Sequence, residues 1–125
     1  MTCEHDCTHL LRENIRYALE PDNPALIPMW ISRETQLSGD NDSTVSYRRH
    51  LHEAQFHLLL DTICDELLPW QWRCSCLDAI YLPLAALRKL STDRESKQQV
   101  RRLLQELSTT CRYFQRSLLP THYTP

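Results

Sequence analysis

The chain has 125 residues, a formal net charge of −2 at neutral pH, six cysteines and a single glycine. This length suits one domain built around a single core. The weak negative charge offers no general attraction to a phosphate backbone, so we do not expect nucleic-acid binding. With one glycine and no glycine-rich motif, a loop that cradles phosphates through its backbone is disfavoured, which argues against a nucleotide-dependent enzyme.

Leucine dominates the apolar residues, with 21 copies against 7 of valine and isoleucine together. Straight-chain side chains favour helices over strands. We therefore predict an all-α protein: a compact bundle of about five helices in a single domain. The bundle spans residues 10–119, between a flexible Cys- and His-bearing tail at 1–9 and a C-terminal tail at 120–125.

The N-terminal residues have neither the basic start nor the apolar centre of a secretory signal. No run approaches the roughly 20 apolar residues that cross a bilayer. We expect a cytoplasmic protein without membrane contact, whose six cysteines stay reduced.

The first helix is expected to begin after Asp6 or Thr8 and to end at the stretch EPDNP, because residues before a proline leave the helical region. Asn23 can cap a second helix with Pro24 at its first position. That helix should bury Ile27, Trp30 and Ile31. The cluster SGDNDS at 38–43 favours turns and separates the chain into two helical parts.

A third helix at about 43–67, capped by Asp42 or Ser43, carries a strip of metal-binding residue types. At 100° per residue the strip occupies an arc of roughly 80°. It comprises His50, Glu53, His57, Asp61 and Cys64. Imidazole and carboxylate groups three or four residues apart meet over one helical turn, and helical bundles hold metals in this way.

We therefore predict an Fe, Mn or Zn site with His50, Glu53 and His57 as ligands and Asp61 as a further partner. The alternative is that these side chains only form hydrogen bonds at a helix seam or face water. The spacing of His52 and His57 does not match the H-E-x-x-H pattern of zinc proteases.

The N-terminal stretch CEHDCTH offers a second set of metal-binding residues. Its donors, Cys3, His5, Cys7 and His9, suit Zn or Cu. All four lie within one short tail, whereas structural zinc sites join separated ligand pairs. The stretch is either a flexible chelator or a frayed terminus.

Pro69 can restart the chain as a fourth helix, with a kink at Pro83. In the fifth helix, Thr92 and Glu95 match a capping box. Apolar residues follow at three- and four-residue intervals: Val100, Leu103, Leu107, Cys111, Phe114 and Leu118. Its outer face is basic and carries Lys97, Arg101, Arg102, Arg112 and Arg116.

The stretch LLPWQWRCSCLD places two tryptophans on different faces of the fourth helix. At least one of Trp70 and Trp72 should enter the core, and the other, with Arg73, could form a surface ledge that docks a partner. The alternative is that both tryptophans close the end of the bundle.

Three stretches occur in the same order and similar spacing in a known family: ALEPD at 18–22, LLLDT at 58–62 and LPWQWRCSCLD at 68–78. Over residues 12–90 the chain resembles the Fur-associated gene A (FagA) family of small bacterial proteins. The resemblance implies a protein made under iron limitation. No catalytic residue or defined ligand comes with that family.

Two functions are consistent with these patterns. The first is a small cytoplasmic accessory protein of iron-limitation and oxidative-stress metabolism that binds a metal through the strip on the third helix. The second is a protein–protein interaction module without metal or catalysis, which docks its partner through the tryptophan segment or the basic face of the fifth helix. An enzyme is the weaker class, because nothing in the sequence indicates an activated nucleophile.

Overall fold

A computed structural model describes the backbone of residues 2–40 and 44–118 and the side chains of residues 8–38 and 44–114. Over these ranges the chain forms six helices and no strand. They are α1 (Thr2–Arg16), α2 (Leu26–Asp40), α3 (Val45–Cys64), α4 (Trp70–Ala79), α5 (Tyr81–Leu90) and α6 (Arg94–Leu118). The predicted all-α bundle is confirmed, and the predicted fourth helix is present as two consecutive helices, α4 and α5.

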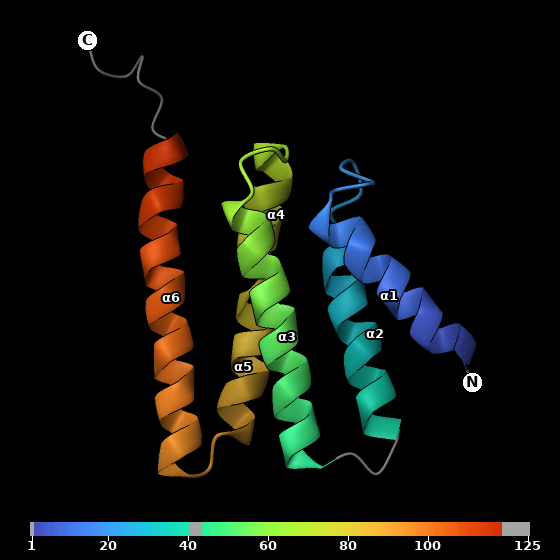
Figure 1. Cartoon of the computed structure of the whole chain (residues 1–125), viewed down its shortest axis with the longest axis vertical. Coiled ribbons are helices and arrows are strands. Elements are labelled where there is room, and N and C mark those ends of the chain that lie inside the picture. Colours follow the sequence, from blue (N-terminus) through green and yellow to red (C-terminus); the bar gives the residue numbers. More distant parts are fainter. Residues whose placement is uncertain (1, 41–43, 119–125) are drawn as a thin grey trace.

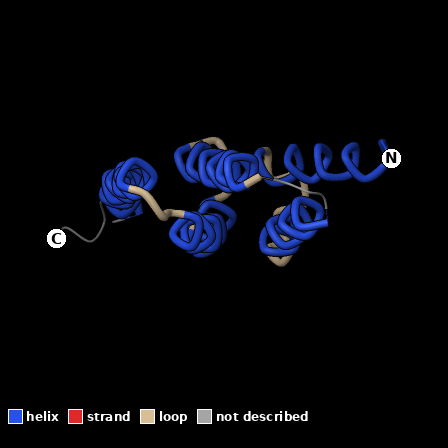
Figure 2. Tube along the Cα trace, turned by 90° about the horizontal axis from the view of Figure 1, so that it is seen from below, coloured by secondary structure: helices blue, strands red, loops and turns tan. Residues whose placement is uncertain are grey.

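The bundle is centred on α3, which packs most extensively against α4 and α5 and also against α1 and α6 (Figure 1). Seen end-on, α1 and α3 lie in one layer and α2 lies beside the α4–α5 pair in the other (Figure 2). The C-terminal helix α6 lies at one edge against α3 and α5. In this arrangement α2 and α5 lie next to each other on the same side of α3.

The first helix begins at Thr2, earlier than the predicted start, since residues 2–8 contain neither proline nor glycine to stop it. It ends in a Schellman-type turn: Leu19 N–H donates to the Asn14 carbonyl at 3.0 Å and Ala18 N–H to the Ile15 carbonyl at 3.3 Å. Ala18 takes the left-handed conformation, with φ of 51°, that glycine usually occupies there.

The third helix begins one residue after Thr44, whose hydroxyl accepts a hydrogen bond from Tyr47 N–H at 3.1 Å. The prediction of Asp42 or Ser43 as the cap is therefore wrong, because Thr44 has the extended backbone and the hydroxyl that a cap requires. The helix ends at Cys64, before the predicted end at 67.

Pro83 breaks the predicted fourth helix instead of kinking it. Proline has no N–H for the carbonyl four residues earlier, that of Ala79, and its ring crowds that carbonyl. The helix accordingly stops at Ala79 and restarts at Tyr81, with Pro83 in the first turn of α5, where its missing donor is tolerated.

The cap of α6 is Asp93, not Thr92. Asp93 Oδ1 accepts from Ser96 N–H at 2.7 Å, and Asp93 N–H donates to Ser96 Oγ at 3.3 Å. This is the reciprocal pattern of a capping box, with Asp and Ser in place of Thr and Glu. The side chain of Ser96, followed by its backbone N–H, holds the pKa of Asp93 below its ordinary value through hydrogen bonding.

The largest fully buried side chains are Trp30, Trp72 and Phe56. Ile27, Trp30 and Ile31 of α2 are buried as predicted, and so are Val100, Leu103, Leu107 and Phe114 of α6. Cys111 is half-buried, and Leu118 lies outside the described side chains. The predicted tail at 120–125 lies outside the described residues.

Candidate functional site

The predicted metal strip on α3 lies on the side of the helix away from the core. His50, His57, Asp61 and Cys64 are exposed, and Glu53 is half-buried. His50 Nδ1 donates to the Ser46 carbonyl at 2.8 Å, and the His57 ring lies edge-on to Phe56, with centroids 5.4 Å apart. Within the described ranges, no group of three or more His, Cys, Asp and Glu side chains is placed to hold a metal ion.

The reason is the position of the buried face of α3. Its buried residues, His52, Gln55, Phe56, Leu59, Thr62 and Ile63, recur at three- and four-residue intervals and centre opposite the strip. The strip therefore faces away from the core, three polar residues share the core face instead, and the leucines beside the strip pack only in part.

Of the predicted N-terminal ligands, Cys3, His5 and Cys7 lie outside the described side chains. His9 is exposed, and its Nε2 lies 3.4 Å from Glu13 Oε1 on the next turn of α1. The structure therefore places only the last of the four donors.

The tryptophan segment divides as predicted between core and surface. Trp72 is 1% exposed and donates its indole N–H to the Ile15 carbonyl at 2.8 Å, whereas Trp70 is 53% exposed. Arg73 does not join a ledge with Trp70. It is buried, donates from Nε to the Ile63 carbonyl at 2.7 Å and stacks over the Phe114 ring at 4.9 Å.

A chain of hydrogen-bonded polar side chains crosses the interior between α1, α2 and α3. Arg12 of α1 donates from Nε and Nη2 to the two carboxylate oxygens of Glu34 on α2, at 2.5 and 3.0 Å. Gln55 of α3 donates from Nε2 to Glu34 Oε1 at 3.1 Å. His52, one turn earlier on α3, lies with Nδ1 2.9 Å from Gln55 Oε1. Glu34, Gln55 and His52 are all buried.

The donor and acceptor roles along this chain are fixed by Glu34. An ionised carboxylate only accepts, so Gln55 must turn its amide N–H toward Glu34 and its oxygen toward His52. His52 therefore carries its proton on Nδ1. No residue in the described part of the chain is bonded to His52 Nε2, which stays accessible from the neighbouring groove although the side chain is only 5% exposed.

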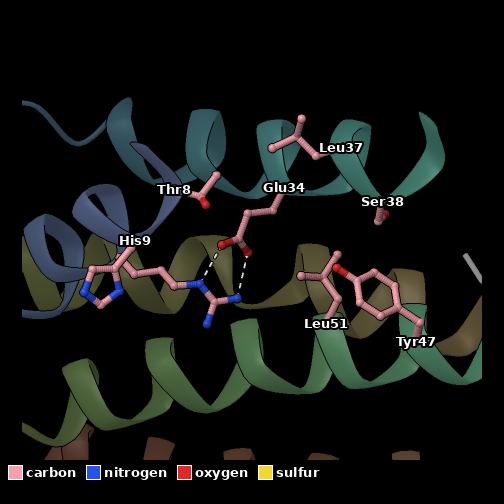
Figure 3. Close-up of a pocket in the computed structure, with 8 residues that line it drawn as sticks. Thr8, His9, Glu34, Leu37, Ser38, Tyr47 and Leu51 are labelled. Carbon is pink, nitrogen blue, oxygen red and sulfur yellow. Dashed lines mark hydrogen bonds and ion pairs between the residues drawn. The ribbon is translucent and has the colours of Figure 1, made fainter. Parts of the chain in front are cut away.

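One end of the polar chain opens into a hollow of about 330 Å³ between α1, α2 and α3 (Figure 3). The carboxylate of Glu34 lines this hollow, and the dashed lines in Figure 3 mark its ion pair with Arg12. Tyr47 and Leu51 of α3 lie opposite Leu37 and Ser38 of α2. Since both oxygens of Glu34 are already bonded, this carboxylate is held as a structural partner of Arg12 rather than as a free base.

The other end reaches a groove of about 660 Å³ between α2 and α5, with α3 as its floor. The α5 wall presents Leu82, Ala85, Ala86, Lys89 and Leu90, and the α2 wall presents Pro28, Ile31, Ser32, Thr35, Gln36 and Ser38. Arg48 and His52 of α3 lie in the floor. The lining is mainly apolar or small, and its charged groups, Arg48 and Lys89, are basic.

Three of the four described thiols are made less reactive by burial. Burial raises the pKa of Cys76 to about 12 and also raises the pKa values of Cys74 and Cys111. A higher pKa leaves less of the reactive thiolate at neutral pH. None of these three cysteines is suited to nucleophilic catalysis.

Reasoning from the sequence missed the polar chain because only apolar residues were used to locate the core face of the third helix. His52 and Gln55 are three residues apart and share a helix face with Phe56 and Leu59. This shared face could have indicated from the sequence that His52 and Gln55 are buried. No spacing in the sequence could have indicated their partners Arg12 and Glu34, because these two residues come from other helices.

The chain matches no protein-family model, and neither a curated protein nor a solved structure is significantly similar to it. Among the helices in the described ranges, none combines the length and apolar character needed to span a membrane.

Proposed function

We propose that the protein is a non-catalytic interaction module that accommodates an amphipathic helix of a protein partner in the groove between α2 and α5. The observation that carries the proposal is the lining of this groove, which combines apolar and small residues with Arg48, Lys89 and His52 and includes no carboxylate among the side chains that the structure describes. Such a lining complements a helix with an apolar face and acidic edges.

The spacing of the wall residues also suits a helix. Leu82, Ala85, Ala86 and Lys89 recur at three and four residues along α5, and Pro28, Ile31, Ser32 and Thr35 do so along α2. Small residues at these intervals allow a third helix backbone to approach closely. With its 10 residues, α5 is about 15 Å long, so the groove matches about three turns of a partner helix.

Site-specific photo-crosslinking tests this proposal. A photoreactive residue at position 85, in the groove, should capture a partner that the same residue at exposed position 109 on α6 does not capture. The captured partner is then purified and its affinity measured. Ala85→Trp, which fills the groove, should weaken binding at least about tenfold, because it removes the space for the helix. The control Thr109→Trp should leave binding unchanged.

The proposal fails if both positions capture the same proteins, or if Ala85→Trp binds the purified partner as the wild type does. Circular dichroism of each variant separates loss of binding from loss of the fold.

A second candidate, the metal-binding accessory protein of iron limitation, is favoured by one observation. Because His50 Nδ1 donates to the Ser46 carbonyl, His50 Nε2 is left as the ligand atom, an arrangement common in metal sites. Its test is elemental analysis for Fe, Mn and Zn after metal is supplied. The wild type is compared with His50→Ala/His57→Ala and with a chain lacking the first nine residues, and a substoichiometric metal content in all three abandons this candidate.

A further inference from the structure

Four cationic side chains gather where α5 meets α6, away from the groove between α2 and α5. Arg88 lies in the last turn of α5, and Arg94, Lys97 and Arg101 follow one another along one face of α6. All four are exposed. They line two adjoining hollows of about 420 and 380 Å³, which share Lys97 and Arg101. We call the two hollows together the basic cleft.

Among the residues that the structure describes, none supplies a counter-charge to the basic cleft. Neither hollow is lined by aspartate or glutamate, and none of the four cations forms an ion pair with a side chain in the described ranges. The nearby carboxylate of Asp93 is engaged by Ser96 as the cap of α6. Like charges held close together repel, so the cleft is a local positive field on a chain whose net charge is −2.

Helix stability does not explain this placement. Cations are unfavourable near the positive N-terminal end of a helix and favourable near its C-terminal end. Arg88 lies at the favourable C-terminal end of α5. Arg94 and Lys97, however, lie among the first four residues of α6, where a cation is unfavourable. A bound anion would relieve both the mutual repulsion and the unfavourable position of these two cations.

We propose that the basic cleft binds a small polyanion that carries two or more phosphate groups. The planar forks of Arg88, Arg94 and Arg101 match phosphate oxygens in pairs, and the Gln98 side chain adds neutral donors. Val100 and Leu104 close the inner side of the cleft with apolar surface. The volume of each hollow lies within the range of small-molecule sites.

A nucleic acid fits the basic cleft less well. The cations from Arg94 to Arg101 extend over seven residue steps, or about 10 Å of helix, and no described aromatic side chain lines the cleft to stack a base. A compact ligand therefore satisfies the cleft better than an extended strand.

Isothermal titration calorimetry with inorganic tripolyphosphate, at an ionic strength of about 50 mM to limit screening, tests the proposal. We expect one ligand per chain and a loss of affinity of about tenfold or more in Lys97→Gln and in Arg101→Gln. The matched control is Arg102→Gln, which removes the same charge from an exposed neighbour outside the cleft and should change affinity less than about twofold. Parallel titrations use citrate and vesicles containing phosphatidylserine.

Three results would overturn the proposal. Equal losses in Arg101→Gln and Arg102→Gln would show a general charge effect instead of a site. Citrate binding as tightly as tripolyphosphate would remove the preference for phosphate groups. Vesicles binding more tightly than tripolyphosphate, with the same dependence on Lys97 and Arg101, would assign the cleft to a membrane surface. Unchanged helical circular dichroism shows that each variant is folded.

Discussion

The outward and inward faces of α3 carry similar chemical groups in different surroundings. His50, Glu53 and His57 on the outward face lie in or near solvent. On the inward face His52 and Gln55 are buried: His52 is bonded to Gln55, and Gln55 donates to Glu34 of α2. Residue type alone does not distinguish these faces. What differs is whether a neighbouring helix supplies the partner that allows a polar group to be buried without a large desolvation penalty.

The largest expected difference in stability between the two faces is that between substitutions of two adjacent residues, Phe56 and His57. Phe56→Ala should lower the free energy of unfolding by about 3–5 kcal/mol, because it empties a fully buried aromatic site. His57→Ala should lower it by less than about 1 kcal/mol, since the exposed ring loses only its edge contact with Phe56. Urea unfolding followed by circular dichroism measures both. Similar losses in the two variants would contradict this assignment of the faces.

The next largest effect is expected for a substitution in the chain of hydrogen-bonded polar side chains on the inward face. Gln55→Ala should cost about 2–3 kcal/mol, because it leaves the His52 N–H unpaired in the interior and removes one donor from Glu34. The matched change on the outward face, Glu53→Ala, should cost less than about 1 kcal/mol. Gln55→Leu keeps most of the side-chain volume. If Gln55→Leu unfolds at the same urea concentration as the wild type, the hydrogen bonds of the chain contribute no net stability.

The smallest effect lies at the C-terminal end of α3, where Asp65 pairs with Arg16. The hydrogen bond from Arg16 Nη1 at 2.8 Å, followed by that from Leu67 N–H at 3.1 Å, holds the pKa of Asp65 below its ordinary value of 3.8. A carboxyl group whose pKa is lowered by folding stabilises the fold above its unfolded pKa and loses this contribution as pH falls through the folded pKa.

The thermal midpoint of the wild type should therefore exceed that of Asp65→Asn by a constant margin between about pH 7 and pH 5, and the margin should shrink as pH falls below about 4. Asp61→Asn makes the same chemical change on the outward strip, where the residue has no ion pair with a described side chain. A margin for Asp65→Asn that is independent of pH down to about pH 2 would show that the pair with Arg16 is not formed in solution.

Much of the secondary structure was predictable, because it depends on local signals. The apolar residues of α2 and α6 recur with the helical period, and their burial follows the prediction. The errors lie at helix ends and at Pro83, where adjacent residues compete for the same role. Thr92 and Asp93 are both good caps, and the structure uses Asp93 because Ser96 completes the reciprocal pair of hydrogen bonds.

The candidate sites were less predictable, because they depend on contacts between helices. Lys97 and Arg101 of the cleft were part of the predicted basic face of the fifth helix, but Arg94 was not, and the meeting with Arg88 depends on the turn between α5 and α6. The groove also needs α2 and α5 to lie side by side over α3. No spacing within one helix indicates such a meeting.

The sequence by itself determined that this chain is helical and which apolar residues of α2 and α6 are buried, because periodicity and proline positions act within a few residues along the chain. Only the tertiary structure decided which polar residues are buried, which tryptophan belongs to the core and where the groove and the basic cleft lie. The physical reason is that a polar side chain is stable in the interior only beside a partner, and here Arg12, Glu34 and Gln55 come from three different helices.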